Sequence, residues 1–177
     1  MKGMRTRDLV YCALFSALIA VFAQIQVPLP GLVPISLATF GIMIAGLLLG
    51  WKYGLLAAAV YVLLGAGGVP VFAGFKGGLA ALTGPTGGYI IGYMPYAALA
   101  GLPVKKCQDA FWGRCGLLAL GTLVCYTLGT AWFMVATGRT LGESMGLCVL
   151  PFLPGDAVKT ALAAFLAPKL RKAKAAK

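Results

Sequence analysis

An acidic and a basic residue, Asp156 and Lys159, stand three positions apart inside the last apolar segment of the chain. This spacing places both side chains on one face of a helix, within its first turns. A charged group near the bilayer centre costs on the order of 2.5–3.5 kcal/mol, so two in one segment indicate a function. The pair suits a polar ligand, with Lys159 holding a carboxylate and Asp156 accepting N–H bonds. Alternatively, the two charges neutralise each other, or Asp156 caps the helix while Lys159 extends outward.

Other chemistry is scarce in this chain. The 177 residues include no His, which excludes Ser-His and Cys-His nucleophile pairs and His-ligated metal or haem. The four acidic residues form no visible carboxylate cluster, and the five cysteines lack C-x-x-C spacing. No G-x-x-x-x-G-K-[ST] loop occurs, so any use of ATP must come from another chain. We therefore expect no enzyme activity, cofactor or metal.

The elements that must position the charged pair are membrane helices. The chain is 60% hydrophobic and 11% charged, which leaves too few polar side chains to coat a soluble domain. Its length predicts a single transmembrane domain over residues 1–177. The apolar runs predict an all-α bundle of six transmembrane helices, at residues 9–26, 35–50, 54–65, 87–104, 115–136 and 151–168.

The net charge of +11 follows from membrane topology and indicates no nucleic-acid partner. With the amino terminus in the cytoplasm, the outer loops contain only Lys76 and Arg139. The cytoplasmic segments then contain twelve basic residues: Lys2, Arg5, Arg7, Lys52, Lys105, Lys106, Arg114, Lys169, Arg171, Lys172, Lys174 and Lys177. This bias predicts a multi-pass protein of the cell membrane with both termini cytoplasmic.

A glycine-rich stretch, residues 65–88, separates the third and fourth predicted helices. Its Gly-Gly-Val-Pro, Gly-Phe-Lys-Gly-Gly and Gly-Pro-Thr-Gly-Gly clusters cannot continue a regular helix. Because the second and third helices are short for a bilayer, we expect a re-entrant or capping loop over the outer mouth of the bundle. An ordinary solvent-exposed connection is the alternative, although Phe72 and Phe75 argue against a fully hydrated loop.

The predicted topology places this loop and the start of the last helix on the same outer side. Asp156 and Lys159 could therefore share one pocket with the aromatic residues Phe72, Phe75 and Tyr89. Such a pocket offers a cation, a carboxylate acceptor, glycine amides and aromatic faces. These groups suit a small ligand that has a carboxylate and amide-type donors.

The first predicted helix has small residues at four-residue spacing, at Ala13 and Ala17 and at Ser16 and Ala20. Small residues let another helix approach closely, which favours an association surface. The same pattern also serves packing within one chain.

Several segments resemble one known family in their order and separation as well as in their residue types. They are 33–37, 45–50, 68–75, 77–79, 84–92 and 153–159, which together extend over nearly the whole chain. The most specific are Gly-Pro-Thr-Gly-Gly-Tyr at 84–89 and Pro-Gly-Asp-x-x-Lys at 154–159. With these segments the chain resembles the BioY family, the biotin-specific substrate-binding (S) components of energy-coupling factor (ECF) transporters.

The resemblance implies a six-helix protein that binds biotin at the outer face. It also implies a transmembrane coupling protein and two cytoplasmic ATPases as partners. Matched position by position, Asp156 and Lys159 are the ligand-binding acid and base, with Tyr89 and the glycine-rich loop nearby. Ala13 and Ala17 resemble the surface that such components present to the coupling protein.

One position departs from the family pattern. Many members look to have an amide side chain in the second span where this chain has Ala38. Lys76 and Thr39 are the candidates to replace that polar contact.

The identity of the ligand rests mainly on the resemblance. A lipoyl- or thiamine-like ligand would require some of the same contacts as biotin.

Two other functional classes remain open from the residues alone. One is a self-sufficient carrier for biotin or a related carboxylate vitamin, driven by an ion gradient, in which Asp156 titrates during the cycle. The other is a membrane assembly factor or lipid-modifying enzyme, which the missing His and scarce acids support poorly.

Overall fold

The computed structural model of the chain describes residues 5–27 and 33–175. Two of the predicted cytoplasmic basic residues, Lys2 and Lys177, lie outside these ranges, as does the side chain of Lys174. The helices are α1 (Thr6–Gln24), α2 (Ala38–Leu49), α3 (Trp51–Ala66), α4 (Leu79–Thr83), α5 (Gly87–Ala100), α6 (Lys105–Asp109), α7 (Phe111–Thr137), α8 (Leu141–Cys148) and α9 (Leu153–Ala175). Two short strands, β1 (Gln26–Val27) and β2 (Ile35–Ser36), pair antiparallel.

The prediction of a mostly helical chain is confirmed. Each of the six apolar segments overlaps one helix, namely α1, α2, α3, α5, α7 and α9. The short helices α4, α6 and α8 and the β1–β2 pair were not predicted, because segments this short carry little hydropathy signal. For α8 a local signal exists, since Thr140 and Glu143 form a capping box at its start.

Length distinguishes the helices that cross a bilayer alone from those that do not. In the described part of the chain, α1 and α7 are long and apolar enough to do so. α8 and α9 pass the same test together, as a pair bent by 51°. α2 and α3 are apolar but shorter, as their sequences indicated. The described helices thus contain two or three candidate spans by length and composition.

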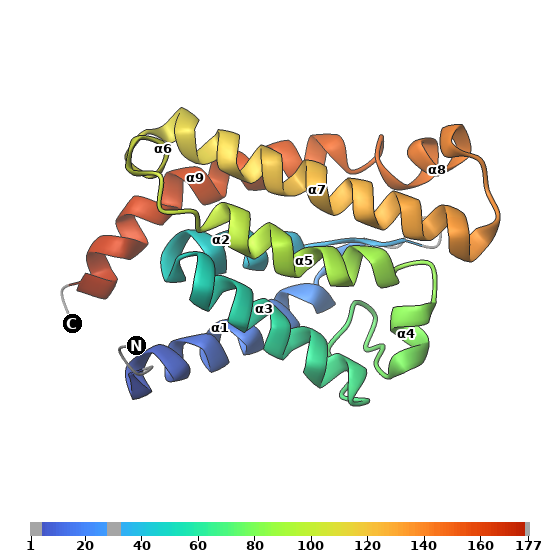
Figure 1. Ribbon diagram of the computed structural model, residues 1–177, viewed down its shortest axis with the longest axis horizontal. Helices are drawn as coiled ribbons and strands as arrows, with labels where there is room; N and C mark the ends of the chain where they lie inside the picture. Colours follow the sequence, from blue (N-terminus) through green and yellow to red (C-terminus); the bar gives the residue numbers. More distant parts are fainter. Residues whose placement is uncertain (1–4, 28–32, 176–177) are drawn as a thin grey trace.

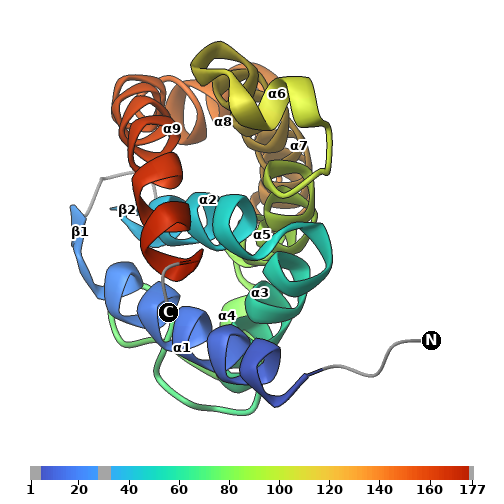
Figure 2. The same ribbon diagram turned by 90° about the vertical axis from the view of Figure 1, so that its left-hand side faces the viewer.

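The helices lie roughly side by side along the long axis of the molecule (Figure 1). Both chain ends, α6 and the α2–α3 junction lie at one end, and α4 and α8 lie at the other. Figure 2, seen along the bundle, shows α2 in the middle, packed against α1, α3, α5 and α9. Eight of the 12 residues of α2 are buried, so this helix forms the centre of the core.

Close helix contacts hold α2 in this central place. A Cβ added at Gly46 would lie 2.7 Å from Cβ of Ala100, and one added at Gly54 would lie 2.9 Å from Cα of Gly46. Real Cβ atoms do not approach so closely, so α2, α3 and α5 pack at a distance that only glycine permits. This packing holds the later part of α2 close to α3 and α5, and Ala38 begins the same helix.

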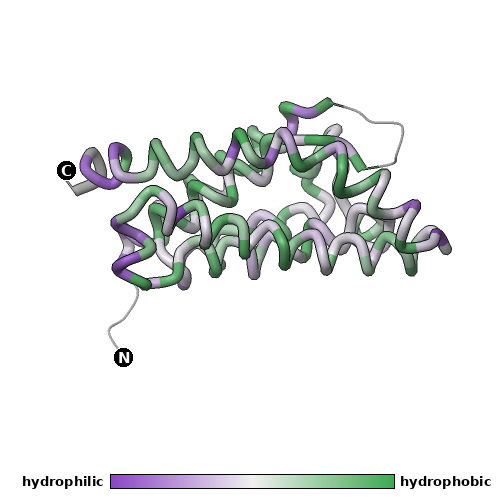
Figure 3. The backbone as a smooth tube through the Cα atoms, turned by 90° about the horizontal axis from the view of Figure 1, so that it is seen from above, coloured by the Kyte–Doolittle hydropathy of each residue, from purple (hydrophilic) through white to green (hydrophobic). Residues whose placement is uncertain are grey.

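The basic residues separate along the bundle. Those at the end that holds both chain termini belong to the starts of α1, α3 and α7, to α6 and to the last turns of α9. Lys76 and Arg139 belong to connections at the opposite end. Figure 3 shows hydrophilic segments near both termini and long apolar stretches in the helices.

Candidate binding site

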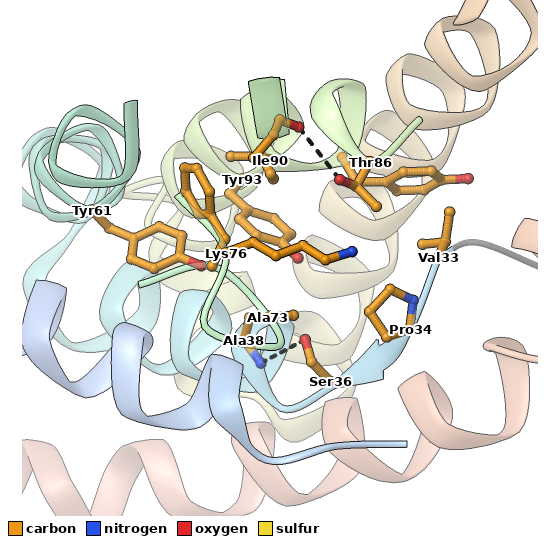
Figure 4. A pocket seen from close by; sticks show the side chains of 13 residues that line it. Val33, Pro34, Ser36, Ala38, Tyr61, Ala73, Lys76, Thr86, Ile90 and Tyr93 are labelled. Carbon is orange, nitrogen blue, oxygen red and sulfur yellow. Dashed lines mark hydrogen bonds between the residues drawn. The ribbon is translucent and has the colours of Figure 1, made fainter. Parts of the chain in front are cut away.

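A cavity of about 50 Å³ lies where β2, α2, α3 and α5 meet the α3–α5 connection (Figure 4). Its aromatic lining consists of Tyr61, Phe72, Tyr89 and Tyr93, and its polar lining includes Ser36, Lys76 and Thr86. The space suits a few water molecules and is smaller than the roughly 300–1,000 Å³ of small-molecule pockets. A vitamin-sized ligand therefore needs some of the lining side chains to move.

A tight turn presents the Lys76 side chain to this cavity. Phe72 and Lys76 exchange backbone hydrogen bonds of 2.9 and 3.3 Å across the turn. Gly74 and Phe75 have φ of 74° and 56°, so the chain reverses through the left-handed region. Phe75 adopts this conformation although it has a Cβ, and its side chain is 72% exposed outside the cavity.

Gln24, at the end of α1, attaches this turn to the bundle. Its Nε2 donates to the carbonyls of Val71 at 3.1 Å and Phe72 at 3.2 Å. Its Oε1 accepts a 2.9 Å hydrogen bond from the backbone N–H of Phe75. One amide side chain thus satisfies three backbone groups of this turn.

Lys76 is the cation of the cavity. Figure 4 shows its ammonium pointing into the space, toward the side where Val33 and Pro34 lie. Within the described ranges, no hydrogen bond or salt bridge joins this ammonium to another residue. Phe72 also lines the cavity, and its ring and that of Tyr61 pack edge to face at a centroid distance of 5.5 Å. The cavity therefore combines a cation with aromatic walls.

Tyr89 forms another wall of the cavity from the first turn of α5. Its hydroxyl shares a 3.0 Å hydrogen bond with Oγ1 of Thr130 and lies 3.4 Å from the carbonyl of Cys148. Its ring packs over Gly129, where an added Cβ would overlap the ring. The ring orientation is therefore fixed by α7.

Asp156 and Lys159 form a buried ion pair in the first turns of α9. Lys159 Nζ lies 2.9 Å from Asp156 Oδ1, and the two residues are 7% and 5% exposed. The ammonium also donates to the carbonyl of Ser36 at 2.7 Å and to Oγ1 of Thr39 at 3.1 Å. All three donors of Lys159 thus have partners, two of which belong to the β2–α2 junction.

The structure brings some of the predicted ligand residues together and separates others. Phe72, Lys76 and Tyr89 line the cavity, and Ala38 lines it with them. Phe75 does not line it. The Asp156–Lys159 pair lies behind Ser36, which faces the cavity while its carbonyl accepts the bond from Lys159.

Ala13 and Ala17 lie on the exposed face of α1. Ser16, from the same ladder of small residues, is buried, and its hydroxyl donates to the carbonyls of Cys12 at 2.8 Å and Ala57 at 2.7 Å. The ladder thus divides into an inward side that packs on α3 and an outward side that is exposed.

Sequence reasoning missed Gln24, Ser36 and Tyr126 as parts of this site. Tyr126 donates from its hydroxyl to Oδ2 of Asp156 at 2.7 Å. The available signal was an amide or hydroxyl inside an apolar segment, because a polar group there needs a partner. No cluster of three or more metal-ligating side chains occurs in the described part of the chain.

Comparison with known proteins identifies relatives along almost the whole chain. The probable biotin transporter BioY of Pyrococcus horikoshii is 42% identical over 168 residues, which cover 95% of this chain and 98% of the relative. The biotin transporter BioY of Thermotoga maritima is 40% identical over 167 residues, covering 94% and 96%.

A solved structure has the same fold. It is the crystal structure, at 2.1 Å, of the S-component for biotin from an ECF-type ABC transporter. The TM-score is 0.88 at 31% identity, and the match covers 96% of this chain and 95% of that one. The model of the BioY family matches residues 1–176. The chain therefore belongs to the BioY family.

Proposed function

We propose that this chain is the biotin-binding S component of an ECF-type transporter and serves biotin uptake. The observation that carries the proposal is the likeness of the whole chain, in sequence and in fold, to an S-component for biotin. The site agrees in its chemistry. Biotin has a carboxylate, a planar ureido group with N–H donors and an apolar thioether ring, and the site offers cations, a buried carboxylate and aromatic walls.

The chain acts as one domain, residues 1–177, with six membrane spans formed by α1, α2, α3, α5, α7 and α9. The shorter helices span the bilayer with the help of their connections and of local thinning or tilt. Both termini face the cytoplasm. The gathering of basic residues at the end that holds both termini supports this orientation.

Lys76 binds the carboxylate of the ligand. Sequence reasoning assigned this role to Lys159, but Lys159 uses all three donors within the protein, whereas the ammonium of Lys76 lies in the cavity with no bonding partner among the residues that the structure describes. Lys76 also shares the cavity with Ala38, which makes it the replacement for the amide that many family members have there.

Asp156 accepts N–H bonds from the ureido ring, and Lys159 orients it. The carboxylate has lone pairs left after its bonds to Lys159 and Tyr126, so it can accept further donors. Ligand entry displaces the lining around Ser36 and extends the cavity to the pair. Phe72 and Tyr89 contact the fused rings of biotin, and Phe75 covers the outer side of the turn.

The energy for uptake comes from partner proteins. They are a transmembrane coupling protein, which contacts the Ala13 and Ala17 face of α1, and two cytoplasmic ATP-binding proteins. The exposed position of these two alanines supports this contact.

The deciding experiment is isothermal calorimetry of biotin and of uncharged biotin amide with the detergent-purified chain. We expect tight biotin binding by the parent and its loss in Asp156→Asn and Lys159→Ala. In Lys76→Ala, the affinity for biotin should fall to the affinity that the parent has for biotin amide, because only the contact with the carboxylate is removed. No biotin binding by the parent would overturn the proposal. Uptake that persists without the ATPases and stops when the proton gradient is collapsed would instead identify a self-sufficient carrier.

A further inference from the structure

The carboxylate of Asp156 is held at both of its oxygens. Oδ1 lies 2.9 Å from the ammonium of Lys159 and 3.5 Å from the hydroxyl of Thr39. Oδ2 accepts a 2.7 Å hydrogen bond from the hydroxyl of Tyr126. Tyr126 belongs to α7 and Asp156 to α9, so this bond is a polar tie between the two helices.

The Tyr126 side chain lies where two apolar grooves meet on the outside of the bundle. One groove, of about 310 Å³, lies between α7 and α9 and is lined by Leu123, Leu153 and Asp156 as well as Tyr126. The other, of about 320 Å³, lies between α7 and α8 and shares Leu123 and Tyr126 with the first. Asp156 therefore has one side toward the cavity region and another at the wall of a groove that faces lipid.

A carboxylate at the wall of such a groove is costly unless every lone pair on that side has a donor or is covered. Lys159 does not donate to Oδ2, because its ammonium lies on the Oδ1 side and is already shared with Ser36 and Thr39. The hydroxyl of Tyr126 is the donor that the structure provides at Oδ2, and its ring stands between the two grooves.

We propose that Tyr126 is a positioning residue for ligand binding: its hydroxyl fixes the carboxylate of Asp156 in one orientation and covers it from the groove between α7 and α9. This inference rests on the proposed role of Asp156 in ligand binding. Tyr126 itself does not line the cavity and makes no ligand contact. Its effect on affinity passes entirely through Asp156.

A neighbouring tyrosine provides the matched control. Tyr96 shares a 2.7 Å hydrogen bond with Oγ1 of Thr122, one turn before Tyr126 on α7. Tyr96→Phe therefore removes a buried tyrosine hydroxyl that bonds α5 to α7, without removing a bond to Asp156. Neither Tyr96 nor Tyr126 lines the cavity.

The experiment compares the parent, Tyr126→Phe and Tyr96→Phe in two measurements. The first is biotin affinity by calorimetry, with the melting temperature of each ligand-free protein as a check of folding. The second is infrared spectroscopy of the ligand-free proteins, in which subtraction of the Asp156→Asn spectrum isolates the carboxylate bands of Asp156. The infrared measurement requires no ligand, so it tests the tie even if biotin is not the substrate.

We expect Tyr126→Phe to shift the Asp156 carboxylate bands and to weaken biotin binding about tenfold, the effect of one hydrogen bond to a charged group. Tyr96→Phe should leave both unchanged. Unshifted bands in Tyr126→Phe would overturn the inference, and so would equal losses of affinity in the two variants. Failure of the parent to bind biotin would overturn the proposed function instead.

Discussion

The guanidinium of Arg114 donates from Nε to the carbonyl oxygen of Ala164 at 2.8 Å. Ala164 is four residues before Pro168 in α9, and Pro168 has no N–H with which to complete that helical turn. Arg114 therefore replaces the helix hydrogen bond that Pro168 cannot make. Its Nη1 also donates to the carbonyls of Gln108 at 2.8 Å and Asp109 at 3.0 Å, so one side chain ties α6, α7 and α9 together.

Arg114→Met should lower the free energy of unfolding by about 2–4 kcal/mol, because it leaves buried carbonyls without donors. Arg114 is 6% exposed, so water cannot readily take its place. The check is unfolding of the detergent-solubilised chain by titration with SDS.

Pro168→Ala distinguishes this bond from a general packing effect. In the Arg114→Met background it should restore about 1 kcal/mol, since α9 regains its own hydrogen bond to Ala164. In the parent it should change the stability much less. Equal effects of Pro168→Ala in both backgrounds would contradict the relationship between Arg114 and Pro168.

The long apolar helices were predictable from the sequence because their hydropathy persists over many residues. α7 nevertheless begins at Phe111, ahead of the predicted residue 115, because Arg114 is buried inside the helix with backbone carbonyls as partners. Sequence reasoning treated this charge as a helix boundary. The partners that make it acceptable inside the bundle belong to other helices, so only the fold reveals them.

The charged pair itself was predictable, since its spacing along one helix is local. The groups that complete it were not, because Ser36, Thr39 and Tyr126 are 123, 120 and 30 residues away from the pair members that they contact. For the same reason the sequence could not show that Lys159 has all three of its donors occupied within the protein. Two of these donors are occupied by the β2–α2 junction.

Gln24→Leu should loosen the turn that carries Lys76. The substitution removes the hydrogen bonds to the carbonyls of Val71 and Phe72 and to the N–H of Phe75, at a cost of about 1–2 kcal/mol in local stability. Hydrogen exchange of the peptide covering residues 71–76 should become faster, and biotin should dissociate faster.

Thr83→Val is the control for this prediction. It removes hydrogen bonds from the Thr83 hydroxyl to carbonyls of α4, in the same connection but outside the cavity lining. Exchange of residues 71–76 should stay at the parent rate. Unchanged exchange in Gln24→Leu would show that the turn is held by its own backbone bonds.

Gly65→Ala should push the Phe72 ring into the cavity. An added Cβ at Gly65 would overlap this ring, which is already packed against Tyr61. We expect a loss of about 1–3 kcal/mol in stability from overpacking and weaker biotin binding, measured by thermal unfolding and calorimetry. Adding Phe72→Leu should recover part of the stability, because the smaller side chain makes room.

Gly116→Ala tests whether such a loss is specific. Gly116 lies in α7, and an added Cβ there meets nothing within 4 Å. This variant should gain up to about 1 kcal/mol in stability from the better helix propensity of alanine and bind biotin as the parent does. A similar loss of binding in Gly116→Ala and Gly65→Ala would show that the loss does not come from displacement of Phe72.

Ala17→Leu should separate ligand binding from energy coupling. Ala17 faces outward on α1, away from the cavity, so the enlarged side chain should leave biotin affinity of the isolated chain unchanged. It should block close approach of a partner helix and thereby abolish both copurification with the coupling protein and ATP-dependent uptake in cells.

Val135→Leu is the control, because it enlarges an apolar side chain at an exposed position of α7. It should preserve both copurification and uptake. Normal uptake by Ala17→Leu would place the partner contact on another face of the bundle, and the outward side of α1 would then be a lipid-facing surface only.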